Sequence, residues 1–524
     1  MFMRWGSVNM SLPRLIGHQT EILYLPEEKN LFVTGSAGSG KSLLALYRVY
    51  WLAKVNPSEN IVLLTFNKPV NNDMKEKLAA IASSRNEEAP HNLTVDTYHI
   101  FMKKLITQLW EYYGNEIPLL KNYINEKYNV AKNYNNEKNK IVEQALEIVK
   151  KNHPQEKTLQ RPLKVFIDEI RWMQQMSIQD ETEYIEAERI GRRDTRIERA
   201  KRPYFYEVYQ KYQELRASDD YEGVFDFEDV GTKVREMLSF ITEKEEFNRQ
   251  FKYKYVFIDE FQDFTSDMLM TINDLLGSYG FLTLLGDVNQ GVFGKRVSFK
   301  SLGINMNQFK RHTLDNNYRN TKEISEFAEL ITESDYFDKS SEYYINAKKG
   351  KREGKPPRVI IYKDQNKEMA EIMHYLEKVN QTDNKFRNIA IIVPTHKYKD
   401  VKKQLEKNHI EYRNVRDAQK NGTERIIYLG TYFQIKGLEF DIVFLPFMDT
   451  ETFKETVSLE NEELNLDDET FAIEQVGTEL LEEHIARIYV GITRARERLY
   501  ITATGELSPL LNSETFEKYL YFRE

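Results

Sequence analysis

Cysteine is absent from the 524 residues, which excludes disulfides, thiolate zinc sites and iron–sulfur clusters and fits a reducing compartment. Long apolar runs are absent as well: no stretch of about 18 apolar residues occurs, and Met1–Met10 lack the apolar run of a signal peptide. The 41% hydrophobic and 30% charged residues leave ample apolar material for a folded chain. We therefore expect a cytoplasmic protein with roughly two to four domains.

An excess of positive charge is also absent. The formal net charge of −8 argues against a protein coated in positive charge, as a histone-like nucleic-acid binder would be. Charge is nevertheless uneven, because residues 189–202 hold seven Arg or Lys and residues 449–483 are strongly acidic. The basic run is either a solvated face or a nucleic-acid contact, and the acidic run is either a mobile surface loop or a partner-binding loop.

A glycine-rich loop stands between a short apolar run, Leu31–Val33, and a helix-forming run, residues 43–51. The loop reads Gly35-Ser36-Ala37-Gly38-Ser39-Gly40-Lys41-Ser42. Glycines allow backbone N–H groups to turn onto phosphate oxygens, which the positive end of the following helix also attracts. The pattern predicts a nucleotide-binding loop in which Lys41 reaches the outer phosphates and Ser42 holds Mg²⁺.

Two carboxylates follow a second apolar run, residues 255–258. Asp259 is expected to hold Mg²⁺ and Glu260 to polarise the attacking water. A similar pair, Asp168-Glu169, has an apolar lead-in that is interrupted by Lys164, and its sequence continues as an amphipathic helix. We therefore interpret this second pair as structural.

A third apolar run, residues 281–285, leads to Gln290, whose amide is expected to sense the terminal phosphate. These three motifs and those that follow resemble the UvrD/Rep/PcrA-like helicases of superfamily 1 over residues 12–502. The resemblance implies an α/β fold of two RecA-like P-loop NTPase domains, each a parallel sheet flanked by helices, with ATP and Mg²⁺ as cofactors. It places the first core at 1–98 and 224–309, a helical insertion at 99–223 and the second core at 310–524, without the 2B insertion domain of larger relatives.

The resemblance assigns further residues to the ATP site. Gln19 and Tyr318 would contact adenine, and Gly437 and Glu439 belong to the fifth motif, residues 431–441. Planar guanidinium groups stabilise the charge of a phosphoryl transition state, so the arginines of the fourth and sixth motifs are expected to act as fingers. The implied catalytic set is Lys41, Glu260, Gln290, Arg319 and Arg494.

Nucleic-acid contacts are implied at six positions, because aromatic rings offer platforms to unpaired bases and short polar groups hold phosphates. These positions are Phe66, Asn67, Tyr98, His99, Phe293 and Thr431. Alternatively, Phe66 and Phe293 are core residues. The chain departs from the family at Phe433, where His is usual, and at Lys295, where relatives carry a stacking tryptophan.

The function implied is an ATP-dependent translocase or helicase on single-stranded nucleic acid, DNA in preference to RNA, moving 3′ to 5′. One alternative is an ATP-driven, nucleic-acid-sensing regulatory subunit of a nuclease complex, for DNA repair or anti-phage defence. Another is a relative that binds ATP without hydrolysing it, although the intact catalytic set argues against this. No nuclease motif accompanies the motor motifs in the sequence.

Overall fold

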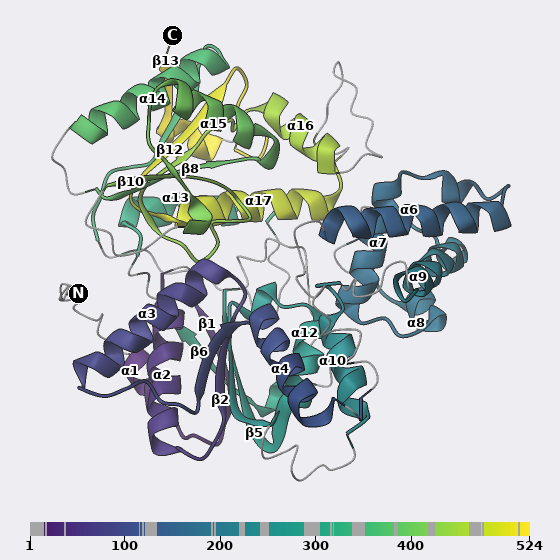
Figure 1. The fold of residues 1–524 in the computed structure, drawn as a ribbon. Helices are drawn as coiled ribbons and strands as arrows, with labels where there is room; N and C mark the ends of the chain where they lie inside the picture. Colours follow the sequence, from purple (N-terminus) through teal and green to yellow (C-terminus); the bar gives the residue numbers. More distant parts are fainter. Residues whose placement is uncertain are drawn as a thin grey trace, which may run out of the picture.

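The computed structural model describes most of the chain, and its elements form two lobes with a group of helices beside the first (Figure 1). The described residues are 15, 18–35, 38–114, 116–117, 120, 134–189, 192, 195–218, 226–241, 251–287, 304–314, 317, 319–337, 350, 352–381, 386–417, 425–460, 473, 476–511 and 514–523.

The first lobe is built on a six-stranded sheet with the order β3-β2-β4-β5-β1-β6, in which all the paired strands are parallel. Its strands are β1 Asn30–Gly35, β2 Ile61–Thr65, β3 Leu93–Thr97, β4 Tyr253–Asp259, β5 Leu276–Gly286 and β6 Phe309–Leu314. Most of these strands are nearly continuous apolar runs because both faces of the sheet are covered. One face packs on α1 His18–Leu23, α2 Lys41–Val55 and α3 Lys68–Ser84, and the other on α4 Tyr98–Tyr113, α10 Val230–Ser239 and α12 Ser266–Leu275.

Two predicted boundaries of this lobe need correction. The boundary at 309/310 falls inside β6, which pairs along its whole length with β1, so the first sheet continues to Leu314. The predicted insertion, 99–223, includes nearly all of α4, yet Phe101, Met102 and Leu105 are buried in the core of the first sheet. The insertion therefore begins after α4.

The second lobe contains a seven-stranded parallel sheet with the order β13-β7-β12-β11-β8-β10-β9. Its strands are β7 Arg358–Tyr362, β8 Asn388–Val393, β9 Arg413–Asn414, β10 Ile426–Thr431, β11 Phe440–Leu445, β12 Ala495–Thr504 and β13 Leu520–Arg523. One face packs on α13 Lys322–Thr332, α16 Thr450–Glu460 and α17 Thr478–Thr493, and the other on α14 Gln365–Gln381 and α15 Tyr398–Lys407. Both sheets thus expose the carboxyl ends of parallel strands, where loops carry ligand sites.

The helical insertion has a hydrophobic core of its own, separate from the cores of the two sheets. Its helices are α6 Tyr134–Asn152, α7 Leu163–Met176, α8 Glu181–Glu186 and α9 Arg202–Arg216. The predicted helix through Asp168-Glu169 is confirmed as α7, whose apolar side chains follow helical spacing. In Figure 1 the insertion projects beside the first lobe, near the end of α17.

Several cations of the basic run 189–202 form hydrogen bonds and ion pairs within the insertion. Glu169 is fully buried and accepts hydrogen bonds from Arg189 Nε at 2.7 Å and Arg192 Nε at 3.2 Å. Arg202 Nη1 donates to three backbone carbonyls, and Lys201 pairs with Glu156 at 2.9 Å. Arg189, Arg192 and Arg202 are thus held by partners within the insertion, which neither interpretation of the run predicts. Lys201 and Arg196 keep 41% and 87% of their side chains exposed, as the solvated-face interpretation predicts.

Candidate active site

The glycine loop lies between β1 and α2, as its sequence pattern predicts. Gly38 and Gly40 have φ angles of +79° and +83°, a left-handed conformation that glycine adopts without strain. Lys41 is buried and donates a hydrogen bond from Nζ to the carbonyl of Gly35 at 2.7 Å. The ammonium group is thus held inside the loop, at the N-terminus of α2, where an anion is favoured.

Gln19 contacts this loop rather than standing apart from it. It is buried on α1 and donates from Nε2 to the carbonyl of Ser39 at 2.7 Å. A Cβ atom at Gly40 would lie 2.4 Å from Gln19 Nε2, so this glycine is required by the close approach. Gln19, which is predicted to contact adenine, therefore lies at the edge of the loop.

Ser42 and Asp259 form the predicted metal-binding pair. Ser42 Oγ donates to Asp259 Oδ2 at 2.7 Å, while Asp259 Oδ1 is buried and makes no hydrogen bond within the described part of the chain. Burial, reinforced by the negative charge of Glu260, raises the pKa of Asp259 to about 7. A buried carboxylate oxygen without a donor and an adjacent serine hydroxyl fit the oxygen ligands that Mg²⁺ prefers.

Glu260 follows β4 directly and has a strained backbone. Its φ of +54° is in the left-handed region, which costs a non-glycine residue about 1–3 kcal/mol and is most often found at functional sites. Burial by itself would raise the pKa of Glu260, but the positive charges of Lys41 and Lys436 outweigh it and lower that pKa. Gln262 donates to Glu260 Oε2 at 2.6 Å and fixes the carboxylate. The group is thus oriented and ionised, as a base requires.

Two arginines approach this site from the side of the second lobe. Arg319 pairs with Glu439 at 2.8 Å, and a Cβ atom at Gly38 would lie only 2.4 Å from Arg319 Cβ. Arg494 caps α17, is fully buried and donates from Nε to the carbonyl of Val490 at 3.0 Å. Burial and, to a smaller extent, the positive charge of Arg319 together lower the pKa of Arg494 to about 10.

The charges around Arg494 show that the two lobes share one site. The negative charges of Glu260 and Asp287 in the first lobe raise the pKa of Arg494, and so does the negative charge of Glu439 in the second lobe. The structure therefore brings Lys41, Ser42, Asp259 and Glu260 together with both predicted fingers. Five residues of the predicted site, and the departure at Lys295, lie outside the described residues: Ser36, Ala37, Gln290, Phe293 and Tyr318.

The described residues among the predicted nucleic-acid contacts lie at or just after the carboxyl ends of strands. Phe66 is half-buried after β2, with its ring centroid 6.2 Å from that of Phe264, and His99 is half-buried after β3. Thr431 ends β10 and is largely buried. Tyr98 differs from the prediction, because its side chain is fully buried among core residues and cannot present a ring face to a base.

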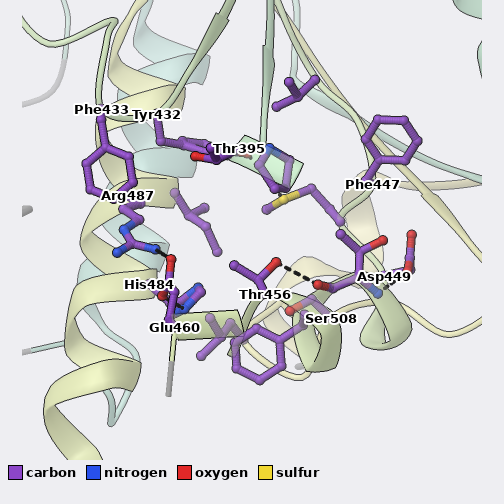
Figure 2. Close-up of a pocket in the computed structure, with 17 residues that line it drawn as sticks. Thr395, Tyr432, Phe433, Phe447, Asp449, Thr456, Glu460, His484, Arg487 and Ser508 are labelled. Carbon is purple, nitrogen blue, oxygen red and sulfur yellow. Dashed lines mark hydrogen bonds and ion pairs between the residues drawn. The ribbon is translucent and has the colours of Figure 1, made fainter. Parts of the chain in front are cut away.

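A pocket opens near the same end of the second sheet, between β8, β10, α16 and α17, and spans about 560 Å³ including the solvent at its mouth (Figure 2). Phe433 lies at its rim, and Arg487 stands under that ring with Cζ 4.5 Å from the centroid. Glu460 accepts from Arg487 at 2.6 Å and pairs with His484 at 2.9 Å. The ring of Phe433 is thus held by a cation on α17, the helix that Arg494 caps.

Three residues of the site were not predicted from the sequence. Gln262 orients Glu260 and also accepts a hydrogen bond from the backbone N–H of Asp287 at 3.3 Å. Lys436 and Asp263 form a buried ion pair between the lobes. Their signal lay in the motifs themselves, since each of the three stands within three residues of a predicted site residue.

The fold and the site define a class of protein. Two parallel sheets flanked by helices meet at one site, with a glycine loop on the first and two arginines on the side of the second, which is the arrangement of two RecA-like P-loop NTPase domains. No helix among the described residues is long and apolar enough to cross a membrane.

Comparison with known families identifies the class more closely. The UvrD/REP helicase N-terminal domain matches residues 17–313, and the UvrD-like helicase C-terminal domain matches residues 312–420 and 414–506. The chain therefore belongs to the UvrD/REP helicase family.

Individual relatives are distant. A protein of Mycoplasma capricolum described as a probable DNA helicase II homolog is 22% identical over 377 residues, covering 70% of this chain and 46% of that protein. DNA helicase II of Escherichia coli is 23% identical over 340 residues, covering 62% of this chain and 41% of the relative. The chain spans less than half the length of each. A solved C-terminal domain of a possible DNA helicase from Lactobacillus plantarum, covering 40% of this chain and 99% of that one, is 17% identical with a TM-score of 0.27, too weak a likeness to carry an argument.

Proposed function

We propose that this chain is an ATP-dependent motor that moves along single-stranded nucleic acid, DNA in preference to RNA, in the 3′ to 5′ direction. The observation that carries the proposal is the shared site, in which a phosphate loop and a carboxylate pair on one lobe meet Arg319 and Arg494 from the other. Because the site is complete only when the lobes meet, nucleotide binding and domain closure are coupled.

Each residue has a role that its surroundings support. Lys41 and the loop amides would hold the phosphates, and Ser42 with Asp259 would hold Mg²⁺, which neutralises charge on the transferring phosphoryl group. Glu260 would orient the attacking water and take its proton. Arg319 and Arg494 would stabilise the charge of the transition state with planar, fixed donors.

The strand would cross the carboxyl ends of both sheets. Phe66, Asn67 and His99 supply the first lobe's part of this surface, and Thr431 and Phe433 stand at the corresponding end of the second sheet. Half-buried rings between short polar groups suit unpaired bases without sequence preference. DNA is favoured because both relatives described above are named as DNA helicases.

The experiment is ATP hydrolysis with and without a short oligo(dT) strand, for the wild-type chain and for Glu260→Gln. We expect the strand to accelerate hydrolysis in the wild type, and Glu260→Gln to lose activity by about 100-fold or more, because a general base is removed. Glu377→Gln, on the exposed face of α14, is the matched control and should behave as wild type. A hydrolysis rate that ignores the strand would end the motor proposal.

Unwinding of duplexes with 3′ or 5′ single-stranded tails, in DNA and RNA, tests direction and substrate. We expect ATP-dependent unwinding only of 3′-tailed DNA. Hydrolysis that responds to the strand without movement along it would instead fit the alternative, an ATP-driven sensor subunit of a nuclease complex.

A further inference from the structure

Lys436 lies where three parts of the proposed machinery meet. It follows β10 in the second lobe, and its ammonium group donates to Asp263 Oδ1 of the first lobe. Its backbone carbonyl accepts a hydrogen bond from Asn67 Nδ2 at 2.7 Å. Both side chains of the ion pair are almost fully buried, with 5% and 1% of their surfaces exposed. One residue therefore contacts both a predicted strand-binding loop and the segment that carries Glu260.

The contact with Asn67 joins the second lobe to the start of α3. Asn67 is the N-cap of α3, and its Oδ1 accepts the backbone N–H of Val70 at 3.0 Å while its Nδ2 reaches Lys436. Gly437 has a φ of +77°, and a Cβ atom there would lie 2.3 Å from Val70 Cγ2. The backbone of the second lobe thus packs directly on the first turn of α3, immediately after Phe66.

The contact with Asp263 leads to the reaction centre. Asp263 ends the short 3₁₀ turn Phe261–Asp263, and its backbone N–H donates to the carbonyl of Glu260 at 2.9 Å. A movement of Asp263 is therefore a movement of the turn that holds Glu260 in its left-handed conformation. The ammonium group of Lys436 also lies close enough to Glu260 for its charge to act on that carboxylate.

We propose that Lys436 is a positioning residue that couples strand binding at α3 to ATP hydrolysis at Glu260, through its hydrogen bond with Asn67 and its ion pair with Asp263. The inference rests on the proposed function, because it assigns a route between the two sites of that motor. Lys436 touches neither nucleotide nor strand in this account.

The energetics of a buried ion pair explain why such a contact can act as a coupler. Its charges are stable in the low-dielectric interface only while they are paired, and removing one partner leaves an uncompensated buried charge. Separation of the lobes returns both charges to water. The pair therefore favours the closed arrangement only when both lobes are aligned, and a strand that shifts α3 changes that alignment.

The experiment measures ATP hydrolysis with and without oligo(dT) for Lys436→Met, Asp263→Asn, the double variant and Lys436→Arg. We expect the single variants to lower the stimulation ratio by about tenfold, within the range of coupling between distinct sites. The KM for ATP and the Kd for oligo(dT) should change by less than about threefold, since neither ligand is contacted. Lys436→Arg should keep most of the stimulation, and Lys402→Met, on the exposed face of α15, should resemble wild type.

The double variant distinguishes coupling from damage to the fold. It removes both buried charges, so it should fold at least as well as either single variant and lose no more stimulation than one of them. Any of three results would overturn this inference and leave the proposed function intact. They are full stimulation in Lys436→Met, an additive loss of stimulation in the double variant, and a KM or Kd that rises as much as the stimulation falls. A wild-type chain without stimulation would overturn the proposed function and this inference with it.

Discussion

Burial separates two aromatic residues that follow neighbouring strands of the first sheet. Phe66 after β2 is half-buried, whereas Tyr98 after β3 has no exposed surface and packs beside Phe264, with 6.0 Å between ring centroids. The two rings belong to similar motifs in the sequence, yet only Phe66 can present a face to a base. Their roles should therefore differ.

We predict that Phe66→Leu raises the Kd for oligo(dT) by about tenfold, because stacking of a base on an aromatic ring contributes about 1–3 kcal/mol to binding. Tyr98→Phe, which retains the buried ring, should change the Kd by less than about twofold. Fluorescence anisotropy with labelled oligo(dT) measures both. An equal rise in the Kd for oligo(dT) in the two variants would contradict this prediction and indicate that Tyr98 also contributes to strand binding.

Glu368 on α14 is a second residue whose burial determines its properties, in this case the pKa of its carboxyl group. Its Oε1 accepts from the backbone N–H of Phe447 at 3.0 Å and from Thr502 Oγ1, while its Oε2 is buried and has no hydrogen-bond partner in the described part of the chain. Burial raises the pKa of Glu368 from 4.5 to about 7. The folded state thus retains a proton that the unfolded chain releases, so stability is lost as pH rises from about 4.5 to about 7.

We predict that Glu368→Gln, which keeps the Oε1 acceptor, stabilises the protein more at pH 8 than at pH 5. The difference should be about 2 kcal/mol, because each unit of pKa shift corresponds to about 1.4 kcal/mol. Urea denaturation at the two pH values measures it, with Glu377→Gln on the exposed face of the same helix as the control. A variant that is less stable than wild type at pH 8 would contradict the assigned burial cost.

Sequence reasoning reached those site residues whose chemistry is local. The sequence was sufficient to predict Lys41, Ser42 and Asp259, because a glycine loop and an acidic pair that follow apolar strands are typical of nucleotide-binding sites. The contacts of Lys436 could not be predicted, since its partners are distant in the sequence and only the packing of the lobes brings them together. The burial of Tyr98 likewise depends on tertiary packing that its motif does not encode.

Among whole elements, the apolar strands were predictable and the polar ones were not. Strands β1, β4, β8 and β11 and the second half of β5 are buried on both faces and therefore read as apolar runs. Strand β6 is an edge strand with the sequence FKRHTL, in which exposed residues separate the two buried ends. Its polar pattern gave no strand signal, which explains the misplaced domain boundary.

Helix α7 carries the insertion's buried charge cluster, and its two acidic neighbours offer a matched test. Glu169 is fully buried against Arg189 and Arg192. Asp168 is 22% exposed and pairs with Lys164, Arg171 and, at 3.9 Å, Arg192. We predict that Glu169→Gln destabilises the insertion by about 3–5 kcal/mol, because buried arginine charge is left unpaired. Asp168→Asn should cost less than about 1 kcal/mol.

Hydrogen exchange followed by mass spectrometry measures the effect on α6, α7 and α9 separately from the two sheets. Faster exchange confined to these helices in Glu169→Gln is the expected result. Unchanged exchange in the insertion would show that the cluster contributes little to its stability, and the basic run would then be open to another role.

For the whole molecule, the contacts between lobes matter more than either sheet alone. Arg319 packs against Gly38 of the loop, and Lys436 joins Asp263 and Asn67 across the same interface. A cycle of ATP binding and hydrolysis would close and open these contacts while the strand-binding ends of the two sheets shift relative to each other. Directional movement is the outcome that this arrangement predicts.

The most direct test is ATP-driven displacement of streptavidin from a biotin placed at either end of a single DNA strand. We predict displacement from the 5′ end only, dependent on ATP and lost in Glu260→Gln, because a motor that moves 3′ to 5′ collides with the 5′ block. Displacement from the 3′ end only would reverse the direction and keep the motor. Rates that are the same with and without ATP at both ends would contradict the central claim.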